Sequence, residues 1–406
     1  MRDKAIEKRS KNILIVSNFI CHARSLDVNR LIHYFKANAC RFVKSPEEAG
    51  HIILMTCGVF KIRQDQCMNI LSRLKEHKAR LIVVGCLPGI AEKRLKKVFH
   101  GQTITTKNLG RIDRLFRDFK IKFKDIPDQN FFAKRNLVTR QRDIKGFRDP
   151  LNAKEAYLRV SNGCLNACAY CVIRPVIGRL VSKPLKDCVN EYRRLLDSGH
   201  REFMFIGDDI GSYGLNIKSS FPRLLRELSR YDKRYRVKWK FRFFNPKWLV
   251  RYESELLAYV KKGKITYMNC DIQSGNNRIL KLMARGYDIK DVTRVLLSFK
   301  KVNPGMELAT DYICGFPSES EEEFLESIAV IKKINFDFVW LRMYSDSQKA
   351  LSFSLPNKVP AGIIYKRLKK SARLLKKAGI KFDIELPSIA HCSSDEKDTF
   401  WVYADR

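Results

Sequence analysis

Three closely spaced cysteines are the residues with the clearest chemical meaning in this chain. Cys164, Cys168 and Cys171 follow the spacing Cys-x3-Cys-x2-Cys. Three thiolates can hold a four-iron cluster and leave its fourth iron free to bind a small molecule. A structural zinc site normally has four ligands, but no histidine lies nearby and the next cysteine is Cys188. We therefore interpret the motif as a site for an open 4Fe-4S cluster; three buried thiols or an incomplete zinc knuckle are the alternative.

The segments around this motif alternate between strand and helix patterns. Strands are expected at 157–160, 203–206, 241–244, 265–272 and 308–313. Helices are expected at 185–197, 221–231, 252–261, 291–301, 321–334 and 362–377, and Ser320 with Glu323 forms a capping box for the fifth. Such a succession predicts a full or partial β/α barrel with its active site at the carboxyl ends of the strands. The cysteine motif follows the first strand, which is the correct end.

The amino-terminal part predicts a separate open parallel α/β sheet. Its buried strands are expected at 13–16, 52–55 and 81–84, with helical periodicity between them at 27–35 and 66–75. Each strand is followed within a few residues by a cysteine, namely Cys21, Cys57 and Cys86. Loops that leave the same edge of a sheet can converge, so these cysteines could form a second three-thiolate site. Packing as small buried hydrophobes is the alternative.

The remaining cysteines lack a comparable pattern, and we interpret them as packing residues. They are Cys40, Cys67, Cys188, Cys270, Cys314 and Cys392. Twelve cysteines in a chain expected to be cytoplasmic favour metal binding or redox chemistry over a disulfide framework. The cytoplasmic location is expected because residues 1–11 are charged rather than signal-like and no apolar run is long enough to span a bilayer.

Charge is the second large signal. The chain has 79 Lys plus Arg against 43 Asp plus Glu, a formal net charge of +36. Such an excess repels itself in the compact state and is typical of a protein with a polyanionic partner, nucleic acid first. A solvated basic surface without an anionic partner is the alternative. An anionic membrane is a less favoured partner because no amphipathic anchor stands out.

Two basic segments could contact phosphates. Residues 236–242 alternate cations with apolar residues at strand period, which predicts one basic face. The helix expected at 362–377 carries Ile364, Leu368 and Leu375 on one face and cations on the other. Those cations are Lys366, Arg367, Lys369, Lys370, Arg373, Lys376 and Lys377. An ordinary solvated helix face is the alternative for the second segment.

The three-cysteine motif resembles that of the radical S-adenosylmethionine (SAM) enzymes. In that superfamily the free iron binds SAM, and one electron cleaves SAM to methionine and a 5'-deoxyadenosyl radical. The aromatic residue before the last cysteine usually lies near the adenine, which implies that role for Tyr170. The cofactor performs the difficult step, while the protein positions it and excludes water.

Within that superfamily, residues 11–380 resemble the methylthiotransferases. Cys21, Cys57 and Cys86 fall where that family binds an auxiliary 4Fe-4S cluster, and Asp27 also matches its first motif. The details are most similar to the archaeal and eukaryotic branch that acts on N6-threonylcarbamoyladenosine in tRNA. The matching runs are 163–168, 209–214, 273–275 and 309–317. They imply SAM contacts for Asp209, Gln273, Ser274 and Asp311, whose alternatives are strand-end turns and helix caps.

The resemblance implies separate roles for two clusters and the domain order of the methylthiotransferases. The expected order is an amino-terminal domain at 11–112, a basic linker at 113–150, a barrel at 151–380 and a short tail at 381–406. The barrel cluster would generate the radical, and the auxiliary cluster would hold the sulfur atom to be attached, the two facing a common cavity. One SAM would donate its methyl group and another would be cleaved. The implied partners are tRNA, a sulfur donor and a reductant such as a flavodoxin or ferredoxin.

Several positions depart from the family pattern. Ile20 stands where glycine is usual, Arg24 where asparagine is common, and Ile177-Gly178 where an arginine-glycine pair is usual. Most members also carry a terminal RNA-binding module called TRAM, and the residues after Gly379 are too few for one. RNA binding would then use other surfaces.

Three functions stay open on this evidence. The first is methylthiolation of a modified adenosine, N6-threonylcarbamoyladenosine in this branch, in tRNA. The second keeps the chemistry but acts on a protein or peptide side chain. The third is an iron-sulfur RNA-binding protein without catalysis.

Overall fold

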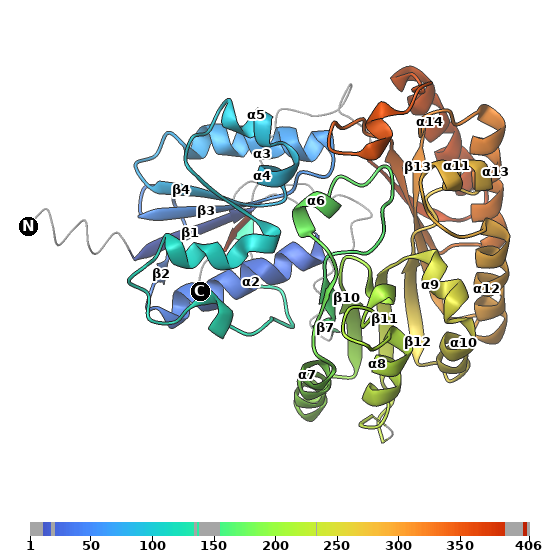
Figure 1. The fold of residues 1–406 in the computed structure, drawn as a ribbon, viewed down its shortest axis with the longest axis horizontal. Coiled ribbons are helices and arrows are strands. Elements are labelled where there is room, and N and C mark those ends of the chain that lie inside the picture. Colours follow the sequence, from blue (N-terminus) through green and yellow to red (C-terminus); the bar gives the residue numbers. More distant parts are fainter. Residues whose placement is uncertain are drawn as a thin grey trace, which may run out of the picture. The chain divides into compact units, whose positions relative to one another are not determined.

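The computed structural model describes residues 11–17, 21–133, 136–137, 155–232, 234–385 and 401–403. They form two compact units (Figure 1). The first unit contains the described residues up to Leu137, Pro175–Ile177 and the strand at 401–403. The second contains the described residues from 155 to 174 and from 178 to 385.

A mostly parallel sheet forms the centre of the first unit. Its order is β5 (Gln102–Thr105), β4 (Arg80–Gly85), β3 (His51–Thr56), β1 (Asn12–Ser17), β16 (Trp401–Tyr403) and β6 (Asn136–Leu137), with β2 (Arg41–Phe42) also paired to β1. β16 runs antiparallel to both β1 and β6, whereas β1, β3, β4 and β5 are parallel. The parallel sheet predicted from the sequence is therefore confirmed.

Helices cover both faces of this sheet, which explains why its strands are continuous apolar runs. Helix α2 (His22–Ala37) packs with Ile13 and Ile15 on one face, and α3 (Lys61–Leu74) packs with Leu14 and Val16 on the other (Figure 1). The short helices α4 (Leu87–Ile90) and α5 (Glu92–Lys96) follow β4, and the 3-10 helices η1 (Thr106–Arg114) and η2 (Phe123–Asp125) follow β5.

The linker expected at 113–150 differs in the structure. Phe116, Phe123 and Ile126 are buried in the same core cluster as α2, and Arg30 of α2 donates to the Ile126 carbonyl oxygen at 2.8 Å. Residues up to 133 therefore pack as part of the amino-terminal unit. The rest of the expected linker, 134–135 and 138–150, lies outside the described residues, as do Ile20 and Cys392.

The second unit is an open parallel β/α barrel. Its strand order is β15 (Lys381–Glu385), β14 (Phe338–Met343), β13 (Glu307–Cys314), β12 (Ile265–Cys270), β11 (Lys238–Phe244), β10 (Glu202–Ile206) and β7 (Glu155–Arg159). Every neighbouring pair is parallel. The helices around it are α7 (Leu185–Asp197), α8 (Phe221–Leu228), α9 (Pro246–Arg251), α10 (Glu253–Lys261), α11 (Asn277–Leu282), α12 (Ile289–Val302), α13 (Glu321–Ile334) and α14 (Ala361–Lys377).

The last part of the chain adds structure that the sequence did not indicate. β15 extends the barrel sheet through β14, although the segment from 381 onward was expected to be a tail. The capping box at α13 is as predicted, because Ser320 Oγ accepts from the Glu323 amide at 3.3 Å and Glu323 Oε2 accepts from the Ser320 amide at 2.9 Å. No helix among the described residues is long and apolar enough to cross a membrane.

The alternation predicted for the strand at 236–242 is present, with Arg236 and Lys238 exposed, but its last two cations are engaged inside the barrel. Trp239 and Phe241 belong to the core between sheet and helices, so Lys240 and Arg242 lie on the opposite, inner face of β11. Lys240 bonds Glu155 and also Glu202. The Arg242 guanidinium lies 5.2 Å from the Trp340 ring centroid. These two cations are engaged within the barrel rather than presented to phosphates.

A buried ion pair anchors α14 to the loop between β13 and α13. Arg367 Nη1 donates to Glu319 Oε2 at 3.3 Å and to the Glu319 carbonyl oxygen at 3.1 Å. Glu319 also accepts from Tyr312 Oη at 3.2 Å and from the Gly315 amide at 2.7 Å. Arg367, a predicted phosphate contact, is therefore a structural residue of this helix.

Candidate functional site

The three-cysteine motif lies in the loop that leaves the carboxyl end of β7, as predicted. Gly163 has φ +74°, and a Cβ there would lie 2.0 Å from the Arg179 carbonyl oxygen, so only glycine fits. Its amide donates to Asp208 Oδ2 at 2.7 Å. The next amide, that of Cys164, donates to the Gly178 carbonyl oxygen at 3.3 Å. Gly178, the glycine that the usual arginine-glycine pair keeps here beside Ile177, thus helps to fix the first cysteine.

Asn166 and Asp209 form a hydrogen-bond chain to Cys164. The Cys164 sulfur accepts from the Asn166 amide and from Asn166 Nδ2, both at 3.3 Å. Asp209 Oδ2 accepts from Asn166 Nδ2 at 2.7 Å and from Trp248 Nε1 at 2.8 Å. Asp209, predicted from the sequence as a SAM contact, is buried and positions Asn166 in this structure. Its other oxygen, Oδ1, has no hydrogen-bond partner among the described residues.

The three thiols are partly buried and interact electrostatically with one another. The pKa of Cys164 is raised to about 12, chiefly by burial and also by Asp209, Cys168 and Cys171. Burial also raises the pKa of Cys171, and the nearby Cys168 and Asp208 act in the same direction. Thiols with such pKa values carry protons at neutral pH, so metal binding here would release protons.

This arrangement fits a cluster better than a single ion. The motif supplies three thiols, whereas a closed zinc site normally takes four ligands. One zinc ion draws its ligands to within about 2.0–2.3 Å, whereas a four-iron cluster binds each thiolate at a different iron. Cys164, Cys168 and Cys171 would hold such a cluster, and when bound with SAM it supplies one-electron chemistry.

The structure adds one residue that sequence reasoning missed. Arg285, in the loop between α11 and α12, donates from Nη1 to the Cys168 sulfur at 3.3 Å and to Tyr170 Oη at 3.1 Å. A lone arginine far from the motif along the chain gives no signal of this contact in a single sequence. Tyr170 is partly buried beside the cluster of Ala169, Phe316 and Tyr344. Its predicted place near adenine stays a prediction.

The other predicted SAM contacts lie at the ends of β12 and β13. Gln273 has φ +63°, an unfavourable conformation for a residue with a side chain, and Ile313 donates its amide to the Gln273 carbonyl oxygen at 3.0 Å. Asp311 accepts from Arg342 Nε at 3.0 Å. Ser274 is fully buried, with its hydroxyl 3.4 Å from that of Ser327 and accepting from the Asn276 amide at 3.2 Å. Ser274 thus has local partners of its own.

Several buried polar atoms near these strand ends lack partners in the described part of the chain. They include Asp209 Oδ1, Asn269 Oδ1, Gln273 Oε1 and Arg242 Nε. Buried polar groups in folded proteins are nearly always hydrogen-bonded, and the exceptions mark water or ligand positions. A polar molecule such as SAM therefore fits the carboxyl end of this barrel, with Gln273 and Asp209 as its best-supported contacts.

The second cysteine set lies on adjacent strands of the amino-terminal sheet. Cys21 directly precedes α2, Cys57 follows β3 and Cys86 follows β4. β1, β3 and β4 are parallel neighbours, so all three cysteines lie at the carboxyl edge of one sheet, as predicted. Gly85 has φ +116°, and a Cβ there would lie 2.3 Å from the Thr56 carbonyl oxygen. This close approach brings the loops bearing Cys57 and Cys86 together, which fits a second cluster held by these thiols.

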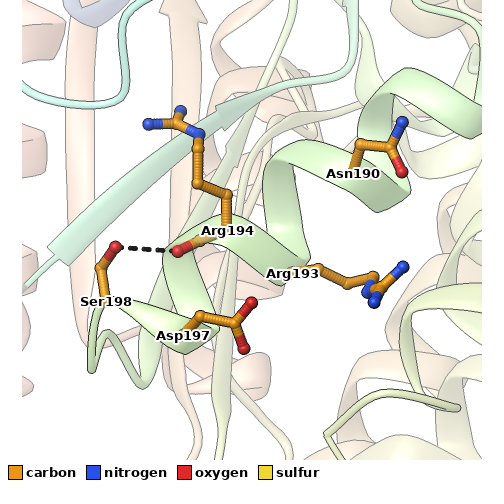
Figure 2. A pocket seen from close by; sticks show the side chains of 5 residues that line it. All are labelled: Asn190, Arg193, Arg194, Asp197 and Ser198. Carbon is orange, nitrogen blue, oxygen red and sulfur yellow. Dashed lines mark hydrogen bonds between the residues drawn. The ribbon is translucent and has the colours of Figure 1, made fainter.

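Two surface hollows are separate from the cysteines. One, of about 430 Å³, lies on α7 and is lined by Asn190, Arg193, Arg194, Asp197 and Ser198 (Figure 2). The Ser198 hydroxyl donates to the Arg194 carbonyl oxygen at 2.8 Å, a bond within the end of the helix. The other, of about 630 Å³, lies in the amino-terminal unit beside β5 and α5. Neither contains a residue predicted to bind SAM or a cluster.

An open parallel β/α barrel with three cysteines after its first strand is the arrangement of a radical SAM enzyme. The chain matches the radical SAM superfamily over residues 158–331 and the uncharacterized protein family UPF0004 over residues 14–106. It is similar in fold to the radical SAM methyltransferase TsrM from Kitasatospora setae, with a TM-score of 0.60, 12% identity, and coverage of 84% of this chain and 77% of that one.

Curated relatives specify the family. The tRNA-2-methylthio-N(6)-dimethylallyladenosine synthase of Syntrophobacter fumaroxidans is 29% identical, covering 87% of this chain and 78% of its own. The probable threonylcarbamoyladenosine tRNA methylthiotransferase of Pyrococcus horikoshii is 26% identical, covering 91% and 84%. The ribosomal protein uS12 methylthiotransferase RimO of Syntrophomonas wolfei is 27% identical, covering 88% and 81%. The chain belongs to the radical SAM methylthiotransferases, transferases that use SAM and 4Fe-4S clusters.

Proposed function

We propose that this enzyme adds a methylthio group to N6-threonylcarbamoyladenosine in tRNA. The observation that carries the RNA assignment is a row of exposed cations on α14. Lys366, Lys369, Arg373, Lys376 and Lys377 are all exposed and recur on one side of the helix. None of them is ion-paired with a carboxylate in the part of the chain that the structure describes.

The contrast within the same helix supports a surface for an anionic partner. Arg367 and Lys370 of α14 do bond carboxylates, those of Glu319 and Glu321. The outer cations therefore keep their charge available, and regularly spaced cations bind the phosphates of a nucleic acid. Relatives from Pyrococcus horikoshii and Archaeoglobus fulgidus named for threonylcarbamoyladenosine, together with the motif runs quoted above, support the choice of adenosine.

The roles of the chain's own residues follow from the site. Cys164, Cys168 and Cys171 would hold one 4Fe-4S cluster, and Cys21, Cys57 and Cys86 a second one that takes part in sulfur attachment. Asp209 and Gln273 would bind SAM through their unpartnered oxygens. A reductant protein such as a flavodoxin or ferredoxin and a sulfur donor would complete the system.

Nucleoside mass spectrometry of tRNA tests the substrate. In tRNA from a deletion strain we expect loss of the methylthio form of N6-threonylcarbamoyladenosine and its return with the intact gene, but not with a Cys164→Ala gene. Loss of the methylthio form of dimethylallyladenosine instead would identify the other tRNA substrate. An unchanged nucleoside profile together with a lighter ribosomal protein would refute the RNA proposal in favour of protein methylthiolation, as in the RimO relative.

Neutralising the α14 row is expected to weaken tRNA binding in a salt-dependent way. Each phosphate contact contributes about 0.7–0.9 to the slope of log K against log salt. Combining Lys366→Gln, Lys369→Gln and Arg373→Gln should reduce that slope by about 2 to 3. Fluorescence anisotropy with labelled tRNA over a salt series measures it.

The matched control removes the same charge elsewhere on the barrel unit. Lys261→Gln, Lys332→Gln and Lys333→Gln change exposed cations on α10 and α13. We expect this triple variant to keep the parent slope. Equal slopes for the two triple variants would show that α14 has no special part in RNA binding.

A further inference from the structure

Arg285 is a buried cation bonded to a cysteine of the barrel motif. Only 6% of the surface of Arg285 is exposed to solvent. Besides Cys168 and Tyr170, it bonds the Asp271 carbonyl oxygen from Nη2 at 2.5 Å and Tyr287 Oη from Nε at 3.5 Å. Arginine is rarely buried unless its charge is compensated.

The partners of Arg285 indicate which anion compensates it. No carboxylate forms an ion pair with it in the part of the chain that the structure describes. Its contacts are instead a thiol, two phenol oxygens and a backbone carbonyl oxygen. Of these, only Cys168 becomes anionic when it binds iron, because metal ligation requires the thiolate. The Asp271 carboxylate also interacts with Arg285, but burial raises the pKa of Asp271, which favours its neutral form. A thiolate at Cys168 would place an anion in direct contact with Arg285.

The loop that carries Arg285 is built onto the cysteine motif. Ala169 donates its amide to the Met283 carbonyl oxygen at 2.9 Å, and both residues belong to the same buried cluster. Ala284 and Gly286, on either side of Arg285, have φ of +55° and +69°. The backbone thus turns sharply on both sides of Arg285 while the loop stays bonded to the motif between Cys168 and Tyr170.

We propose that Arg285 is a positioning residue that orients Cys168 and Tyr170 and stabilises the reduced state of the barrel cluster. Hydrogen bonds to cluster sulfurs tune the reduction potential, and a nearby cation favours the form with one more negative charge. The inference rests on Cys164, Cys168 and Cys171 as cluster ligands. It does not depend on the substrate, so its test needs neither tRNA nor a methylthiolated product.

The test compares reduction potentials of a single cluster. In the full chain with Cys21, Cys57 and Cys86 replaced by alanine, only the barrel cluster would titrate. Anaerobic titration followed by electron paramagnetic resonance measures its midpoint potential, and chelator challenge measures iron retention. We expect Arg285→Met to shift the midpoint to a more negative potential and to weaken iron retention by about 10- to 100-fold.

Two further variants make the result specific. Arg285→Lys keeps the charge, but a lysine lacks the planar fork needed to reach Cys168, Tyr170 and the Asp271 carbonyl together, so a smaller negative shift is expected. Arg278 lies on the nearby α11, is exposed and pairs with Glu323 of α13. Arg278→Met should leave the midpoint potential and the iron retention at the parent values.

A parent-like midpoint in Arg285→Met would overturn the proposal, even if iron retention fell, because the effect would then be structural only. If Arg285→Met binds no iron, Arg285→Lys decides. A more negative midpoint in the lysine variant supports the proposal, and an unchanged midpoint overturns it.

Discussion

Replacing Cys164, Cys168 or Cys171 with alanine is expected to abolish the formation of 5'-deoxyadenosine from SAM. Each thiol is one of only three in the motif. Loss of any one should therefore leave the barrel without a stable cluster. Anaerobic incubation with SAM and dithionite, followed by chromatographic detection of 5'-deoxyadenosine, measures the effect, and the product should fall below the detection limit.

Cys188→Ala is the matched control for these three variants. Cys188 is fully buried on α7 and bonds the Lys183 carbonyl oxygen at 3.9 Å, so it packs within the same barrel unit. Its variant should keep iron binding and SAM cleavage. Reductive SAM cleavage by a reconstituted Cys164, Cys168 and Cys171 triple variant would disprove the assignment of the motif.

Replacing Cys21, Cys57 or Cys86 with alanine is expected to separate SAM cleavage from sulfur attachment. These cysteines lie in the amino-terminal unit, whereas the barrel motif and the candidate SAM contacts belong to the other unit. 5'-Deoxyadenosine formation should therefore persist, while methylthio product falls below detection. Mass spectrometry of the RNA product, run beside the nucleoside assay on the same reaction, gives both readings.

The control for the second set is Cys40→Ala. Cys40 precedes β2, which pairs with the start of β1, so it lies at the opposite edge of the same sheet. Burial raises the pKa of its thiol to about 11. Full methylthiolation by all three single variants of the proposed auxiliary site would exclude a second cluster there.

The sequence was most informative where an apolar run that predicts a strand is followed by a cysteine. The runs at 13–16, 52–55 and 81–84 are strands of one parallel sheet, and the cysteine after each one lies at its carboxyl edge. This placement was predictable because parallel strands buried on both faces are continuous apolar runs and share one direction. The barrel order and the position of the motif after β7 followed from the same regularity.

Contacts between distant side chains were beyond prediction from one sequence. The bond from Arg285 to Cys168 depends on how the loop after α11 folds back onto the motif, and no local pattern encodes that return. In the basic strand, alternation alone does not tell that Lys240 lies inside the barrel, where it meets Glu155 and Glu202. The sequence around Phe116 and Phe123 predicts a linker because the residues that they pack against lie on α2, far away along the chain.

The buried anchor of α14 has a further consequence for recognition. Because Arg367 is bonded to Glu319 inside the unit, α14 is fixed to the loop between β13 and α13. The cations on its outer side are consequently displayed on a rigid support. An incoming ribose-phosphate chain would lose its own freedom but would not have to order the helix as well, and such preorganisation favours tight association.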